Sequence, residues 1–261
     1  MRHDIKYTFL FATIVCVVCG VLVSWSAVSL ADRQAENAAL DKMKNVLMVS
    51  GLAKQGEKLS AEQARGLFEQ AIKPVAVELA TGKITGAIDP AEYDQRAAAA
   101  DPKLSRPAPP NPAKVKRLPK YAVIYEVVDK SGQPTMLVLP VEGYGLWSTL
   151  YGFLALDVDL DTIRGLSYYE QGETAGLGGE VDNPRWKALW PGRKVFDKSG
   201  QVAIAVIKGH AGPPDTDPYH VDGLSGATLT SRGVTNMLHF WLSDAGFGPF
   251  LKNYGASRKD G

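Results

Sequence analysis

The chain has 261 residues, of which 45% are apolar and 22% are charged, and its formal net charge at pH 7 is +1. This length and composition predict one membrane anchor followed by one ordinary globular region. A net charge so close to zero argues against nucleic acid as a partner and against strong electrostatic steering of ligands.

Residues 7–31 form an uncharged, apolar stretch that is long enough to cross a bilayer with some tilt. The segment before it, residues 1–6, is basic, which places the N-terminus in the cytoplasm. Residues 32–261 then form a domain on the other side of the inner membrane, in the periplasm. The alternative is a signal peptide cleaved after residue 31, but the apolar stretch is much longer than the core of roughly 7–15 residues that signal peptides have.

Both cysteines, Cys16 and Cys19, lie inside this apolar stretch. They share one face of a helix, where small, apolar packing against lipid or a neighbouring helix is their expected role. The globular region therefore has no disulfide and depends on its core for stability.

Two helices and a strand are predicted next. Residues 33–52 continue the anchor as a helix. Ser60 and Gln63 have the spacing of a capping box at the start of another helix, which Pro74 limits. Apolar and polar residues then alternate through residues 75–79, as they do in a strand.

Residues 101–119 contain six prolines and predict extended, polyproline-like chain without regular structure. Such a segment either separates two domains or forms an excursion on the surface of one. We expect the excursion, because residues 53–100 are too few to bury a core of their own.

Several short β-type runs follow the prolines and predict a sheet. These runs are residues 121–128, 135–141, 149–156, 163–169 and 201–208. The tetrapeptide Asp-Lys-Ser-Gly occurs at residues 129–132 and 197–200, between apolar runs, as is typical of a hairpin turn. The pattern predicts an α+β domain with a twisted, mainly antiparallel sheet and flanking helices.

Two groups of residues invite a metal-site hypothesis. The acidic run at residues 157–161 resembles the start of a calcium loop, but Thr162 and Tyr168 stand where such a loop needs Gly and Glu. His210 and His220 lie in a Pro- and Gly-rich loop without the spacing of a zinc site. We therefore predict no metal site.

Residues 222–228 read Asp-Gly-Leu-Ser-Gly-Ala-Thr and precede a segment with the periodicity of an amphipathic helix. The apolar face of that helix consists of Val234, Met237, Leu238, Trp241, Leu242 and Ala245. Thr230 or Ser231 is its predicted N-cap. A hydroxyl-rich loop beside free helix N–H groups suits an anion, whereas a capped helix start that binds nothing is the alternative on local chemistry alone.

The heptapeptide resembles the flavinylation motif of the FMN-binding domains in ion-pumping respiratory complexes. Residues 173–179, Glu-Thr-Ala-Gly-Leu-Gly-Gly, resemble a second motif of that family, with Ala175 where Pro is usual. Residues 142–156 and 169–174 are similar to the C subunit of the sodium-translocating NADH:quinone reductases, and this resemblance extends over nearly the whole chain. In that family the last Thr of the heptapeptide, here Thr228, carries FMN through a phosphoester.

The resemblance implies one covalent FMN per chain, with Thr228 as its attachment point and no catalytic residue. Ser225 would donate a hydrogen bond to the phosphate, Gly226 would let the backbone approach it, and Ala227 would avoid crowding it. Arg232 would pair with the phosphate or remain a solvated surface residue.

The isoalloxazine ring requires apolar contacts on its faces and polar contacts on its edges. From the second motif, the residues assigned to these contacts are Glu173, Thr174, Leu177 and Gly178. Tyr144 and Trp147 are the candidate stacking partners, with simple filling of the core as the alternative. Lys208 is assigned a place near the ring, where it would stabilise reduced, anionic flavin.

The family likeness implies an electron-relay subunit in a six-subunit membrane complex that couples NADH oxidation by quinone to Na⁺ export. It also implies a separate flavin transferase that uses FAD and Mg²⁺. The chain has neither a dinucleotide-binding fingerprint nor a set of iron–sulfur cysteines, so it has no complete catalytic site of its own. The alternatives are the G subunit of an Rnf-type ferredoxin:NAD oxidoreductase and a non-redox, anchored periplasmic binding or structural protein.

Overall fold

The computed structural model describes residues 4–54 and 56–259 and divides into two compact units, Met1–Lys42 and Met43–Gly261. The first unit is helical and belongs to α1 (Ile5–Val49), whose most apolar 18-residue window has a mean hydropathy of 2.3. Among the described residues, α1 is the one helix that is long and apolar enough to cross a membrane. Residues 1–3 of the predicted cytoplasmic segment 1–6 lie outside the described residues.

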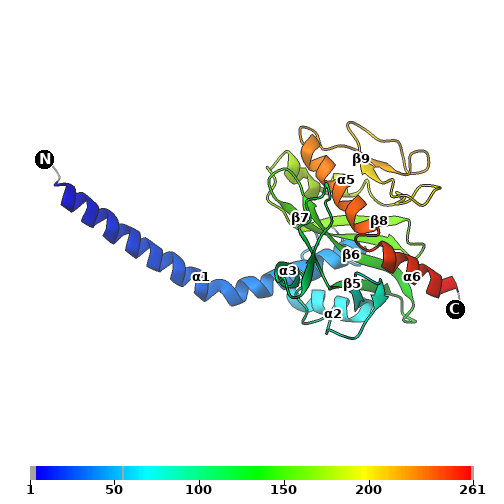
Figure 1. Cartoon of the computed structure of the whole chain (residues 1–261), viewed down its shortest axis with the longest axis horizontal. Coiled ribbons are helices and arrows are strands. Elements are labelled where there is room, and N and C mark those ends of the chain that lie inside the picture. Colours follow the sequence, from blue (N-terminus) through cyan, green and yellow to red (C-terminus); the bar gives the residue numbers. More distant parts are fainter. Residues whose placement is uncertain (1–3, 55, 260–261) are drawn as a thin grey trace. The chain divides into compact units, whose positions relative to one another are not determined.

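The second unit is built on a six-stranded sheet with the strand order β2-β1-β5-β6-β7-β8, in which every neighbouring pair is antiparallel (Figure 1). The strands are β1 (Ile72–Glu78), β2 (Lys83–Ile84), β5 (Tyr121–Val128), β6 (Pro134–Tyr144), β7 (Thr149–Asp157) and β8 (Ile163–Glu170). The predicted α+β class with a mainly antiparallel sheet is confirmed. The first Asp-Lys-Ser-Gly turn joins β5 to β6, as expected.

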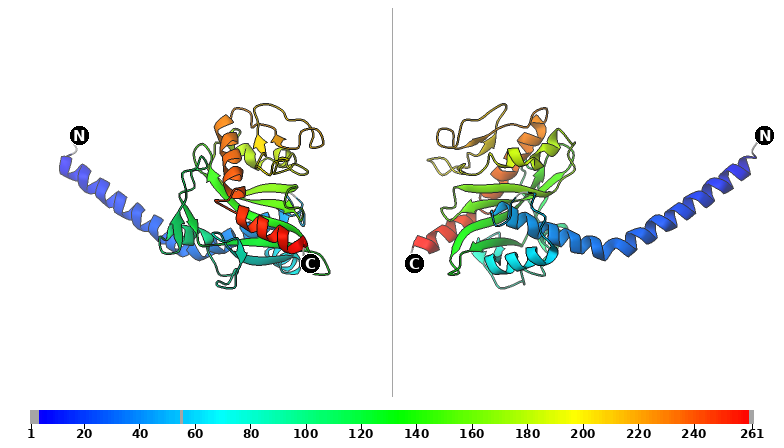
Figure 2. Two further views of the ribbon diagram at one scale, coloured as in Figure 1. Left: turned by 45° about the vertical axis from the view of Figure 1, so that its right-hand side comes forward. Right: turned by 180° about the vertical axis from the view of Figure 1, so that it is seen from behind.

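Helices cover both faces of this sheet. On one face lie α5 (Thr228–Leu242) and α6 (Gly248–Lys259), which are seen in front of the strands in the left view of Figure 2. On the other face lie α2 (Ala61–Ala71) and the last turns of α1. The core therefore forms on both sides, because alternate strand residues point to opposite faces.

Glycines in the strands let these helices approach closely. A Cβ on Gly143 of β6 would lie 2.6 Å from the Cβ of Met237 in α5. A Cβ on Gly165 of β8 would lie 2.9 Å from the carbonyl oxygen of Val49 in α1. Both distances are too short for a real side chain, so each glycine marks a direct helix–sheet contact.

Shorter elements complete the unit: α3 (Gln95–Ala100), β3 (Ser105–Pro107), β4 (Arg117–Pro119), η1 (Gly178–Asp182), α4 (Pro184–Lys187), β9 (Ala205–Val206) and β10 (His220–Val221). The capping box of Ser60 and Gln63 is confirmed at the start of α2. The helix predicted at residues 33–52 is the outer part of α1 and ends at Val49.

Two strand-level expectations were wrong. The Pro-rich segment is not free of regular structure, because β3 and β4 form an antiparallel pair at its two ends. Residues 201–208 do not form one hairpin strand: beyond the turn at 197–200 there is a single antiparallel bridge, and β9 pairs in parallel with β10 instead. The partner strand is distant in the sequence, so no local pattern indicated it.

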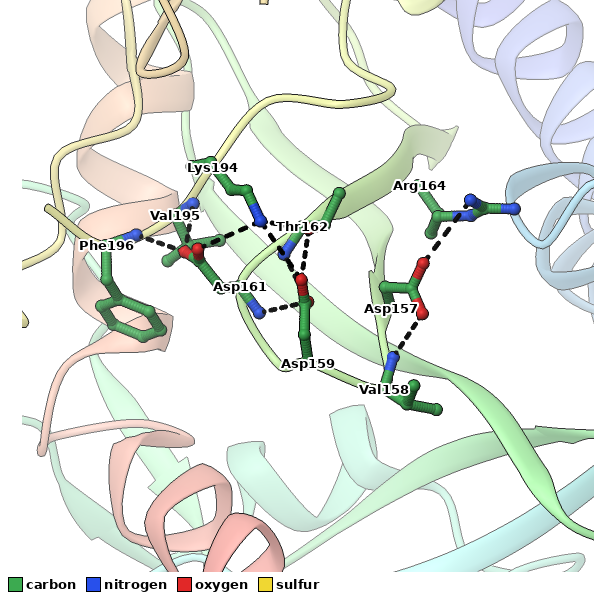
Figure 3. A network of polar contacts seen from close by, with 9 residues as sticks. All are labelled: Asp157, Val158, Asp159, Asp161, Thr162, Arg164, Lys194, Val195 and Phe196. Carbon is green, nitrogen blue, oxygen red and sulfur yellow. Dashed lines mark hydrogen bonds and ion pairs between the residues drawn. The ribbon is translucent and has the colours of Figure 1, made fainter. Parts of the chain in front are cut away.

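Asp159 and Asp161 of the acidic run form a polar network around Lys194, whereas Asp157 pairs with Arg164 (Figure 3). The Asp159 carboxylate accepts the backbone N–H groups of Asp161 (2.9 Å) and Thr162 (2.7 Å), and it lies 3.2 Å from the Lys194 ammonium. Asp161 accepts the N–H of Val195 at 3.0 Å and pairs with the same ammonium at 3.4 Å. The network thus ties the β7–β8 turn to the segment after α4.

This network predicts an acid-sensitive contribution to stability. Burial raises the pKa of Asp159, but hydrogen bonds from Thr162, Asp161 and Lys194 outweigh it and lower the pKa to about 2, from a usual 3.8. A carboxyl whose pKa is lowered by folding stabilises the protein above its unfolded pKa and loses that contribution as the pH falls through its folded pKa. Because the side chain is about half exposed, the contribution is below about 1 kcal/mol.

We expect Asp159→Asn to lower the free energy of unfolding at pH 6, and the difference from wild type to shrink between pH 3.8 and about pH 2. Urea titrations of the full chain in detergent measure both values. Asp215→Asn, on an exposed loop, is the matched control. A difference that stays the same at pH 6 and pH 2 would contradict the assignment.

Candidate functional site

Three loops converge at the first turn of α5. They are residues 222–228, which lead into the helix; residues 173–179, which follow β8; and residues 145–148, which join β6 to β7. A Cβ on Gly233 of α5 would lie 2.5 Å from the Tyr144 carbonyl oxygen, so the helix lies directly against the β6 end. The two sequence motifs, far apart in the chain, are therefore neighbours.

The carboxylate of Glu173 connects these loops. It accepts the backbone N–H groups of Leu146 (3.1 Å), Trp147 (2.9 Å) and Ser148 (3.0 Å), and the hydroxyl of Thr230 donates to it at 2.6 Å. We call this arrangement the Glu173 clamp. Burial, the largest single influence, raises the pKa of Glu173, but the hydrogen bonds from Thr230 and the three amides together hold it below its usual range. The clamp therefore works with an ionised carboxylate, for which such hydrogen bonds are strongest.

Glycines of the motifs make room for the clamp. A Cβ on Gly178 would lie 2.6 Å from the Thr230 hydroxyl oxygen and 2.7 Å from Glu173 Oε2. Gly226 has a φ of +70°, a left-handed conformation that favours glycine, and a Cβ there would lie 2.9 Å from Leu177 Cδ2. Leu177 of the second motif thus packs directly over the backbone of the first.

The predicted N-cap of α5 was wrong. The helix begins at Thr228, and its N-cap Ala227 has no side chain that can accept a hydrogen bond. Thr230 instead donates to Glu173, and the Ser231 hydroxyl accepts the N–H of Leu224 at 3.1 Å. By contrast, α2, α3 and α4 each have a side-chain cap. In the described part of the chain no side chain caps the start of α5, so its first N–H groups, with the helix dipole, favour an anion.

A cavity of about 570 Å³ lies beside this uncapped turn. Thr228, Ser225 and Gly226 line it, together with Lys208 from the loop after β9 and Arg232 from α5. The titratable side chains of its lining are Lys208, Arg232 and His210. None of the described residues that line it carries a carboxylate. The cavity therefore combines hydroxyls, a close backbone and positive charge, which fit a phosphate group.

Asp222, the first residue of the heptapeptide, braces one wall of the cavity. Its carboxylate accepts the N–H of Ala211 at 2.9 Å and lies 2.7 Å from His210 Nδ1, while Trp186 Nε1 donates to its carbonyl oxygen at 2.9 Å. Burial raises the pKa of Asp222, but the hydrogen bonds from Ala211 and His210 outweigh it and lower the pKa below its usual value, so the carboxylate is ionised. The sequence did not reveal this bracing role, although the position of the aspartate in the motif was a signal.

The remaining candidate residues do not line the cavity. Trp147 is 66% exposed, so the alternative that it fills the core was wrong. The Tyr144 hydroxyl donates to the Trp147 carbonyl oxygen at 3.1 Å, and Thr174 lies on the exposed turn before Leu177. Leu177 and Leu229 are 43% and 50% exposed, and together with Trp147 we call these exposed apolar side chains of the converging segments the apolar rim.

Comparison with known proteins identifies relatives of this chain. A family model described as "FMN-binding domain" matches residues 145–243, which include the three loops and α5. The chain is 49% identical to the C subunit of the Na(+)-translocating NADH-quinone reductase of Pseudomonas aeruginosa over 249 residues, 94% of each chain. It is 45% identical to the C subunit of the Vibrio vulnificus reductase over 252 residues, 96% of this chain and 95% of the relative.

Two solved structures have the same fold. The crystal structure of NqrC from Shewanella oneidensis matches with a TM-score of 0.75 and 36% identity, over 82% of this chain and 96% of that chain. The crystal structure of the Na(+)-translocating NADH-quinone reductase C subunit from Parabacteroides distasonis matches with a TM-score of 0.65 and 28% identity, over 85% and 96% of the two chains.

The Glu173 clamp predicts that Gly178→Ala is destabilising. The added methyl group must push Thr230 away from Glu173, and we expect a loss of about 1–3 kcal/mol in the free energy of unfolding. Gly66→Ala in α2 is the matched control, because its Cβ would meet nothing within 4 Å and alanine is the better helix former. Thermal unfolding followed by circular dichroism compares the two variants. Equal melting temperatures would show that the clamp can relax without cost.

Proposed function

The chain belongs to the family of Na(+)-translocating NADH-quinone reductase C subunits, and from this premise we propose that it is the electron-relay subunit of such a reductase, with FMN as its redox group. The observation that carries the proposal is the cavity beside the uncapped start of α5, which is lined by Thr228 and two basic residues, Lys208 and Arg232. Within the family, this threonine is the one that the flavinylation motif designates.

Thr228 is the proposed site of covalent attachment, through a phosphoester between its hydroxyl oxygen and FMN. The phosphate would keep a negative charge in such an ester, and the N–H groups of the first α5 turn and Arg232 would offset that charge. Lys208, which the sequence assigned to the ring, lines the same cavity as Thr228, so we now propose that it lies near the phosphate. Ser225 would donate a hydrogen bond to the phosphate, and the left-handed backbone at Gly226 would let the loop approach the phosphate closely. Ala227 is buried and leaves the first turn without a competing side-chain cap.

When bound, FMN would supply reversible one-electron transfer. The apolar rim is the proposed environment of its ring, with Trp147 and Leu177 on the ring faces and Tyr144 beside them. Glu173, Thr174 and Gly178 shape the edge of this environment through the clamp and the turn before Leu177. The attachment is at the phosphate, so it fixes the flavin without altering the electronics of the ring.

The wider setting follows from the family. We propose that the partners of this chain are the other subunits of a six-subunit membrane reductase, and that the complex couples electron transfer from NADH to quinone with Na⁺ export. A flavin transferase installs FMN. Relatives that match over nearly their full length favour the C subunit of a sodium-translocating reductase over the G subunit of an Rnf-type complex.

The attachment site has a direct test. We expect the intact mass of the full chain, purified from a host with the flavin transferase, to exceed the polypeptide mass by one FMN unit. Thr228→Val removes the ester oxygen at nearly constant volume and should show the bare mass and no in-gel flavin fluorescence. Thr216→Val, on an exposed loop, is the matched control and should keep both signals. Flavin that persists in Thr228→Val would exclude this threonine, and wild type without flavin would favour a non-redox anchored protein.

The membrane topology is tested separately. We propose a single uncleaved span at residues 7–31, with the N-terminus in the cytoplasm and residues 32–261 in the periplasm. Alkaline phosphatase fused after residue 40 should be active, because that enzyme folds only outside the cytoplasm, and N-terminal sequencing should find the uncut chain. A mature protein that begins at residue 32 would refute the span.

A further inference from the structure

A continuous series of polar contacts joins the last turns of α1 to the Glu173 clamp. We call it the polar chain; its members, in order, are Asn45, Ser167, Lys187, Asp182, Gln171 and Glu173. It passes around β8, the outermost strand on its side of the sheet. The helices on opposite faces of the sheet, the end of α1 and the start of α5, are thereby connected through polar side chains.

The first part of the polar chain is buried. Ser167 of β8 is 2% exposed, and its hydroxyl donates to Asn45 Oδ1 of α1 at 2.8 Å. The same hydroxyl oxygen accepts a hydrogen bond from Lys187 Nζ of α4 at 3.3 Å. The Lys187 side chain is only 11% exposed, and a buried ammonium needs every acceptor that the fold supplies. Its position therefore depends on where Asn45 holds Ser167.

The second part leads to the clamp. Lys187 forms an ion pair with Asp182 Oδ1 at 3.1 Å, and Gln171 Nε2 donates to Asp182 Oδ2 at 3.1 Å. The other end of the Gln171 amide accepts the backbone N–H of Glu173 at 2.7 Å. Both ends of this amide are engaged, so its orientation is fixed. A shift of Asp182 is transmitted to the backbone of Glu173.

The end of α1 is firmly seated on the sheet. Val46 and Leu47 are 1% and 0% exposed, and the Val49 carbonyl oxygen lies against Gly165 of β8. These residues belong to the same continuous helix as the predicted membrane span. This seat of α1 on β8 includes Asn45, the first residue of the polar chain.

We propose that Lys187 and Asp182 are positioning residues, which transmit the seating of α1 on β8 to the Glu173 clamp and so hold the loop at residues 145–148 in place. The inference rests on the proposed function, because it treats that loop as part of the flavin environment. Displacement of Asn45 removes the acceptor of the Ser167 hydroxyl, so the Ser167 oxygen that accepts from Lys187 is no longer held in place. Lys187, Asp182 and Gln171 then lose their fixed positions, and the flavin environment loosens when the end of α1 leaves its seat on β8.

The test compares Lys187→Met with Lys252→Met in the full chain in detergent. Lys252 also pairs with an aspartate, Asp244 at 2.7 Å, but both side chains are more than two-thirds exposed and lie outside the polar chain. Hydrogen exchange at the backbone amides of residues 146–148, which donate to Glu173, is the readout. We expect exchange there to become about tenfold faster in Lys187→Met and to stay unchanged in Lys252→Met.

Asn45→Leu is the second variant, at the far end of the polar chain, and it decides the question if Lys187→Met does not fold. It should accelerate hydrogen exchange at the same amides. Lys187→Arg keeps the cation, and its amides should exchange as slowly as those of wild type. Wild-type exchange at residues 146–148 in folded Lys187→Met and Asn45→Leu would overturn the proposal. An equal rise over all of β6 and β7 would also overturn it, since that pattern is general destabilisation.

Exchange is measured on flavin-free chain from a host without the transferase, so this result does not depend on FMN. In a host with the transferase, the rate of FMN incorporation followed by intact mass should fall about threefold in Lys187→Met and remain at the wild-type value in Lys252→Met. Faster exchange with unchanged incorporation would overturn the link to the flavin site. Wild type that takes up no flavin would refute the proposed function, while the exchange data would still test the polar chain.

Discussion

The ionised carboxylate of Glu173 is the contact on which the site depends. Five donors from two separate parts of the chain converge on it: three backbone amides and the Ser148 hydroxyl of the β6–β7 loop, and the hydroxyl of Thr230 in α5. A buried charge with fewer partners would cost several kcal/mol, so the donors and the carboxylate require one another. The clamp therefore fixes the start of α5 relative to the sheet, and with it the position of Thr228.

The geometry of the heptapeptide follows from this constraint. Because Thr230 donates to Glu173 and Ser231 accepts from Leu224, neither hydroxyl is available to cap α5. The helix start is left with unsatisfied N–H groups that an alanine N-cap cannot satisfy, directly beside Lys208 and Arg232. The two hydroxyls that could have capped α5 hold the loops together instead, and the uncapped turn that results has the chemistry that suits an anion.

Local chemistry made much of this predictable. The strand at residues 121–128 has the bounds that its apolar run predicted, and the turn at 129–132 forms because Asp129 accepts the N–H groups of Ser131 and Gln133 nearby. Failures occurred where the partner is remote. Thr230 was wrongly assigned as a possible cap. Its actual acceptor, Glu173, lies 57 residues earlier in the chain, so no local pattern could show this contact. The run at 201–208 was assigned to a hairpin, although β9 pairs with β10, whose residues carry no periodic signal. The two motifs were identified by family resemblance, and only the folded structure showed that they lie next to each other.

The start of α5 has two chemically different sides. On one side, the cavity presents hydroxyls and positive charge; on the other, the rim presents Trp147, Leu177 and Leu229 to solvent. Gly226 belongs to both: it lines the cavity, and a Cβ there would lie 2.9 Å from Leu177 Cδ2. The glycine of the motif is therefore required twice: for the left-handed turn before α5, where its φ is +70°, and for the close approach of Leu177.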